Sequence, residues 1–277
     1  MHANSPLRLT RRLLGACVLA VSFAACAGIS QQEEVQMGAQ GAQQVQAQLP
    51  LLNDASVTSY VSSLGRSLAS TTSRADLNWQ FGVVNSQVIN AFALPGGFIY
   101  VNRGILSAAS NESELAGVLS HEIEHVVRRH SVKQMEQAQG ANMGVTLACT
   151  LTSVCQNQAA AAAIQVGGTA LFARYSRGDE VEADRGGFDN LVRTGINPRG
   201  QLTFFEKLLA EEQRSGGSGS AASFFATHPG TTDRIADIQR MLSGNASRLT
   251  GLRNDSQAFQ AMKRRLAQLP AAPRAAR

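Results

Sequence analysis

The strongest constraint on the fold is an apolar stretch between residues 111 and 136 that carries two histidines and a glutamate at helical spacing. Asn111, with Glu114 three residues later, is a typical helix N-cap pair. The apolar positions that follow occupy most sides of the predicted helix: Leu115, Val118, Leu119, Ile123, Val126 and Val127. Such a helix is buried, and buried imidazole and carboxylate groups need partners. We therefore expect a central helix that holds polar groups for a chemical purpose.

The polar groups form the segment His121-Glu122-Ile123-Glu124-His125. Histidines four residues apart lie about 40° apart around a helix, so both ring nitrogens can converge on one metal ion. Glu122 lies between them, where its carboxylate can take a proton from a water bound to that ion. The pattern predicts a catalytic zinc site. The alternative is an ordinary polar helix face.

A catalytic zinc ion takes three protein ligands and keeps one position open. The metzincin arrangement would need glycine at 128 and histidine at 131, where this chain has Arg128 and Ser131. A glutamate from a second helix is the other arrangement, and Glu180 lies 55 residues after His125. Asp184 shares its helix face, so Glu180 can bind the metal while Asp184 accepts an N–H from one of the histidines.

Three motifs together resemble the gluzincin metallopeptidases of the HtpX and BepA type. They are the His-Glu-x-x-His segment at 121–125, the Glu-x-Glu-Ala-Asp segment at 180–184, and Asn-Ala-Phe-Ala-Leu-Pro-Gly-Gly at 90–97. The resemblance extends from about Glu33 to Met241 and is strongest for the exported lipoprotein branch. It implies a mainly helical α+β zincin-like domain with a small β-sheet or hairpin beside the active-site helix. It also implies an endopeptidase that cleaves misfolded or misassembled cell-envelope proteins.

The resemblance also implies roles for single residues. One Zn²⁺ per chain would be held by His121, His125 and Glu180, with Glu122 as general base and Asp184 as the acid that hydrogen-bonds a ligand. His228, in Thr-His-Pro at 227–229, would lie near the zinc. We expect it either to donate a hydrogen bond to the oxyanion or to fill the open zinc position at rest.

Two further residues, His130 and Arg234, are expected neither to bind the metal nor to take part in catalysis. His130 lies about 140° from His125 on an ideal helix, so we expect it not to bind the metal. Arg234 is expected to be a structural ion-pair partner.

Periodicity and capping residues predict the remaining elements. Strands are expected over 79–84 and on both sides of the turn Pro95-Gly96-Gly97, over 87–93 and 98–101. The segment Phe98-Ile99-Tyr100-Val101 is expected to pair with an extended substrate by adding a strand, unless it is an internal strand. Further helices are predicted over 33–48, 53–68, 178–193 and 198–213, from near 232, in a buried hairpin at 141–173, and around 259–266.

The first 25 residues have the features of an export signal. A basic region up to Arg12 is followed by an apolar stretch and by small residues before Cys26, as in a lipoprotein signal peptide. We expect a lipidated Cys26, a tether over 26–32, the metallopeptidase domain over 33–250, and a C-terminal helix and tail over 251–277. Ordinary cleavage after Ala27 is the alternative. The predicted location is the periplasm, anchored to the outer membrane.

Export leaves Cys149 and Cys155 in an oxidising compartment, so we expect a disulfide between them, with two buried thiols as the alternative. The signal segment holds three arginines and no acid, so the formal charge of +5 falls to +2 without it. That small charge gives little support for nucleic-acid binding. The expected partners are unfolded or misassembled envelope proteins and, through the lipid, a membrane. The competing hypotheses are a non-proteolytic chaperone or assembly scaffold and a structural metal-binding domain.

Overall fold

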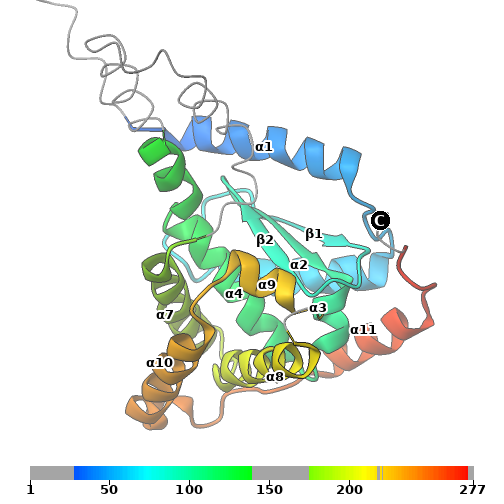
Figure 1. The fold of residues 1–277 in the computed structure, drawn as a ribbon, viewed down its shortest axis with the longest axis vertical. Coiled ribbons are helices and arrows are strands. Elements are labelled where there is room, and N and C mark those ends of the chain that lie inside the picture. The colour runs from blue at the N-terminus through cyan, green and yellow to red at the C-terminus, as the bar shows by residue number, and fades with distance from the viewer. Residues whose placement is uncertain (1–27, 139–174, 217–218, 220, 274–277) are drawn as a thin grey trace, which may run out of the picture.

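The computed structural model describes residues 28–138, 175–216, 219 and 221–273. This part of the chain is mainly helical with one small mixed sheet (Figure 1), which confirms the expected α+β class. The signal segment with Cys26, the predicted hairpin at 141–173 and the pair Cys149 and Cys155 lie outside the described residues. Within the described ranges, no helix combines the length and apolar character needed to cross a bilayer.

The sheet has the strand order β1-β3-β2, with β1 at Gln80–Val84, β2 at Ala91–Leu94 and β3 at Phe98–Asn102. β1 runs parallel to β3 and β2 runs antiparallel to it, through the turn predicted at Gly96 and Gly97. Both glycines have positive φ angles, +74° and +100°, which favour glycine.

The position of β3 corrects one expectation from the sequence. Its residues pair with β1 on one side and with β2 on the other. The segment Phe98–Val101 therefore has no free edge at which an extended substrate could add a strand, because both rows of backbone groups are already hydrogen-bonded. The free-edge assumption was wrong because strand order depends on contacts that are distant in the sequence.

Helices cover both faces of the sheet. In Figure 1, α1 (Gln31–Gln48) runs across one side, where Phe98 and Tyr100 pack against its apolar face. Ile99 and Val101 point the other way, into the main core shared with α2 (Ala55–Ala69) and α4 (Glu112–Val127). This alternation buries all five residues of β3, as expected for a strand covered on both faces.

Helix α4 begins as predicted, with the Asn111 side chain accepting a hydrogen bond from the Glu114 N–H. It ends earlier than predicted, at Val127, and a second helical segment follows over 130–138. The break lies at Arg128 and Arg129, and Arg129 has a left-handed backbone with φ of 57°. That conformation costs a residue with a side chain about 1–2 kcal/mol. Glu34 of α1 supports it by accepting a hydrogen bond from Arg129 Nε at 2.8 Å.

The other labelled helices pack on α4 or on elements that contact it. They are α3 (Arg103–Ala108), α7 (Arg177–Arg193), α8 (Arg199–Ser215), α9 (Ala222–Thr227), α10 (Thr231–Gly244) and α11 (Gln257–Gln268). Two of them, α3 and α9, were not predicted, because six residues are too few to establish a helical period. Helices α7 and α8 pack directly on α4. The close approach of α8 depends on Gly200, where an added Cβ would lie 2.2 Å from the carbonyl carbon of Ser113.

We expect Gly200→Ala to lower the free energy of unfolding by about 1–3 kcal/mol, the usual cost of overpacking. The clash is with backbone, which cannot rotate away as a side chain can. The matched control is Gly244→Ala, because an added Cβ at this helical glycine has no neighbour within 4 Å. Thermal unfolding of both variants would check this, and equal melting temperatures would contradict the close approach.

Candidate metal centre

Two consecutive turns of α4 place His121 and His125 side by side. Both are 1% exposed, and their Nε2 atoms lie 3.0 Å apart. Glu180, from the first turn of α7, faces both rings: its Oε2 lies 3.4 Å from His121 Nε2 and its Oε1 lies 3.4 Å from His125 Nε2. The structure therefore brings together the three ligands predicted from the two separate motifs.

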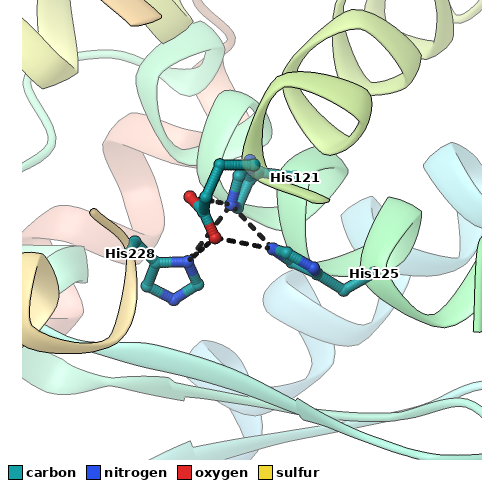
Figure 2. Close-up of side chains that lie close together, drawn as sticks. His121, His125 and His228 are labelled. Carbon is teal, nitrogen blue, oxygen red and sulfur yellow. Dashed lines mark hydrogen bonds and ion pairs between the residues drawn. The ribbon is translucent and has the colours of Figure 1, made fainter. Parts of the chain in front are cut away.

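His228 completes the group from a different part of the chain. It lies between α9 and α10, and Figure 2 shows its ring directed at the two α4 histidines. Its Nδ1 is 3.1 Å from Glu180 Oε1 and 3.3 Å from His121 Nε2. The candidate ligand atoms of His121, His125, Glu180 and His228 all lie within 4.8 Å of one another, and all four residues are buried.

Asp184, expected beside one of the two histidines, lies behind His121. Its Oδ1 is 2.9 Å from His121 Nδ1, on the side of the ring that faces away from the cluster. Arg234 of α10 holds the same carboxylate with two hydrogen bonds, from Nε at 2.6 Å and from Nη2 at 2.8 Å, and also contacts Glu180. Arg234 is thus an ion-pair partner inside the site, and it is only 2% exposed.

Two neighbours of His125 were not predicted. The ring of Tyr175 stacks on it with centroids 3.7 Å apart and an angle of 15° between the planes. His130 approaches its other nitrogen, with the two Nδ1 atoms 2.8 Å apart. An ideal helix would have placed His130 elsewhere, and the break at Arg129 changes that. No spacing in the sequence connects Tyr175 to the motif on α4.

The charges around the cluster are those that attract a cation. Burial and Arg234 oppose protonation of His121, but Glu180 and Asp184 outweigh them and raise the pKa of His121 to about 9. Burial lowers the pKa of His125 well below its usual value, which keeps that ring neutral, as a metal ligand requires. A metal ion can thus take the place of the proton that the site otherwise favours on His121.

The three carboxylates of the site differ in the direction in which their pKa values are shifted. Burial opposes ionisation of Asp184, but Arg234 outweighs it and lowers the pKa of Asp184 to about 2. The pKa of Glu180 is also lowered, because His228, His121 and Arg234 together overcome the effect of burial. Glu122 shows the opposite shift: burial raises its pKa. Among the described residues, neither Glu122 oxygen has a hydrogen-bond partner.

These observations test whether the residues fit a zinc ion, and they do. Two imidazoles and a carboxylate are the usual ligands of a catalytic zinc, and His228 adds a third imidazole. The Asp184 carboxylate only accepts hydrogen bonds, so His121 donates from Nδ1 and directs Nε2 at the cluster. The buried Glu122 carboxylate has His228 Nε2 at 3.5 Å from its Oε1 but no hydrogen bond among the described residues, which is costly unless something in the site binds it.

We expect Glu180→Gln to weaken zinc binding more than Asp184→Asn, for which an affinity loss of about 10–100-fold is typical of a ligand's hydrogen-bond partner. The amide keeps the size of the side chain but removes the negative charge next to the ion. Competition with a zinc chelator, alongside unfolding of the metal-free proteins, would measure this. Wild-type affinity in Glu180→Gln would mean that another residue is the third ligand.

The sequence is similar to those of several known proteases. Residues 55–242 match peptidase family M48. The beta-barrel assembly-enhancing protease of Escherichia coli O157:H7 is 35% identical over 216 residues, which cover 75% of this chain and 43% of that protein. The metalloprotease YcaL of Escherichia coli K12 is 32% identical over 195 residues, 68% of this chain and 74% of YcaL.

A mitochondrial relative is similar to the same degree. The metalloendopeptidase OMA1 of Schizosaccharomyces pombe is 32% identical over 185 residues, 67% of this chain and 53% of OMA1. The chain spans less than half the length of the beta-barrel assembly-enhancing proteases that it matches. The match to the family covers the sheet, the helices α4 and α7 with the candidate ligands, and His228. The chain belongs to peptidase family M48, and the region that matches this family contains the four candidate metal ligands.

Proposed function

We propose that the protein is a zinc endopeptidase that cleaves unfolded or misassembled proteins of the cell envelope. The observation that carries the proposal is the buried convergence of His121, His125 and Glu180 beside Glu122, a carboxylate without a hydrogen-bond partner among the described residues. A protease named for beta-barrel assembly is among the relatives, which supports envelope proteins as the substrate class. The complete set of ligands and base favours this reading over a non-proteolytic chaperone or scaffold.

Each residue of the centre has a distinct task in peptide hydrolysis. His121, His125 and Glu180 would hold the zinc ion, which when bound supplies a Lewis acid for the attacking water and the scissile carbonyl. Glu122 accepts the proton of the attacking water and passes it to the leaving nitrogen. Burial raises the pKa of Glu122, which makes it a stronger base than an exposed glutamate. Asp184 and Arg234 keep the His121 ring oriented.

His228 is proposed to fill the open zinc position at rest. Its Nδ1 already lies among the ligand atoms, although it comes from a connection between helices and not from α4 or α7. The four candidate ligands and Glu122 are all 0–1% exposed, so a peptide reaches them only after a covering segment moves. The alternative is that His228 donates a hydrogen bond to the oxyanion during the reaction.

The proposed location follows from the first residues of the chain. We propose that residues 1–25 are removed as a lipoprotein signal peptide and that Cys26 carries the lipid, which places the domain in the periplasm at the outer membrane. Exposure to an oxidising compartment supports the proposed disulfide between Cys149 and Cys155.

Glu122→Gln should keep zinc binding and thermal stability while proteolysis of casein falls by orders of magnitude. The amide fills the same space and can still hydrogen-bond water, but it cannot accept the proton. Glu124→Gln is the matched control, because Glu124 is a buried glutamate on the same helix whose carboxylate pairs with Arg128 outside the cluster. Turnover at the wild-type rate in Glu122→Gln would assign the base to another residue.

His228→Ala should raise the rate of casein cleavage and leave the zinc content unchanged, because the resting position on the metal becomes free. Thr227→Ala serves as the neighbouring control, since its hydroxyl donates to backbone oxygens of α9 and to no other group among the described residues. Initial rates and metal content of the three proteins decide between the two roles. A His228→Ala protein that holds zinc normally but no longer cleaves would establish the donor role instead.

A further inference from the structure

We propose that His130 is a positioning residue that fixes the ring of His125 on the metal by accepting a hydrogen bond from His125 Nδ1. The inference rests on the proposed zinc site and assigns a task to a histidine that the spacing of the motif had excluded from the site. His130 is 0% exposed, and its Nδ1 lies 2.8 Å from Nδ1 of His125. The argument concerns which nitrogen carries each proton.

A hydrogen bond between two ring nitrogens needs one donor and one acceptor. His125 directs Nε2 toward His121 and Glu180, within the cluster of ligand atoms. A neutral histidine that binds a metal through Nε2 carries its proton on Nδ1. His125 Nδ1 is therefore the donor, and His130 Nδ1 must be the acceptor.

The surroundings of His130 favour the same arrangement. Its Nε2 has no hydrogen bond among the described residues, but two carboxylate oxygens lie 3.5 Å away, Asp179 Oδ1 and Glu182 Oε2. Carboxylates only accept, so they draw the proton of His130 to Nε2 and leave Nδ1 with a lone pair. That lone pair faces His125.

The backbone break after α4 makes the contact possible. Arg129 adopts a left-handed conformation, and its N–H bonds to the carbonyl of Val126. His130 then begins the next helical segment directly behind His125, instead of 140° away as on a continuous helix. Strain of this kind in a residue with a side chain persists where the surroundings enforce it, often next to functional groups. Here Glu34 and the Ile29 carbonyl bind the Arg129 side chain.

The two metal-binding histidines of α4 are thus supported in parallel ways. Asp184 of α7 fixes His121 directly. His125 is fixed by His130, which is in turn oriented by two carboxylates of α7. Loss of such a partner typically costs about 10–100-fold in metal affinity, because the ring gains freedom and its basicity falls.

The test compares the zinc affinity of the full-length protein and three variants by competition with a fluorescent chelator. His130→Leu removes the acceptor and keeps an apolar side chain in the space. His130→Asn restores an acceptor oxygen near the position of Nδ1. Val132→Ala is the matched control, because Val132 is a 1% exposed neighbour whose truncation weakens packing without a polar change. Unfolding of each protein in excess EDTA measures stability without metal.

We expect His130→Leu to bind zinc about 10–100-fold more weakly than wild type, His130→Asn to recover most of that loss, and Val132→Ala to bind as wild type does. Equal affinity in all four proteins would overturn the positioning role and leave the proposed zinc enzyme intact. An equal loss in His130→Leu and Val132→Ala would overturn it too, since packing alone would explain the loss. A wild-type protein that binds no zinc would overturn the proposed function and this inference with it.

Nitrogen NMR of the zinc-loaded wild type provides a readout that a purely structural role would not produce. The spectrum should show the proton of His125 on Nδ1 and that of His130 on Nε2. A proton on His130 Nδ1 would make it the donor and would overturn the proposal.

Discussion

The packing of α7 against α4 is the contact on which the metal centre depends. It places Glu180 and Asp184, two buried carboxylates, against His121, and Arg234 closes the group from α10. Charges removed from water destabilise a fold unless each one meets a partner. In this protein the partners are the imidazoles, the guanidinium and, by our proposal, a metal ion. The residues of the metal centre therefore also contribute to the packing and stability of the core.

The residues on α4 and α7 could be predicted from the sequence because local rules decide them. The asparagine cap of α4 and the spacing of His121 and His125 require only helical geometry. Glu180 could be paired with them because a zinc site needs a third ligand. The role of His228 came from a family resemblance, since no local pattern connects a residue between two distant helices to the motif.

The parts that could not be predicted depend on contacts between distant segments. Neither proline nor glycine marks the break at Arg129, so periodicity alone extended α4 by about nine residues. The same error placed His130 away from His125. The order of the strands in the sheet could not be predicted either. β1 pairs with β3 although β2 lies between them in the sequence, and the alternation of side chains along one strand does not identify the strands beside it.

Glu34 of α1 bonds to other parts of the fold besides Arg129. Its carboxylate also accepts hydrogen bonds from Arg74 Nη1 at 2.8 Å and from the Gly96 N–H at 3.1 Å, so one residue joins α1, the β2–β3 turn and the break that precedes His130. A connection of this kind is reciprocal in free energy. A change that promotes local unfolding of α1 would therefore lower the affinity for the metal. Binding of the metal would in turn slow amide hydrogen exchange in α1.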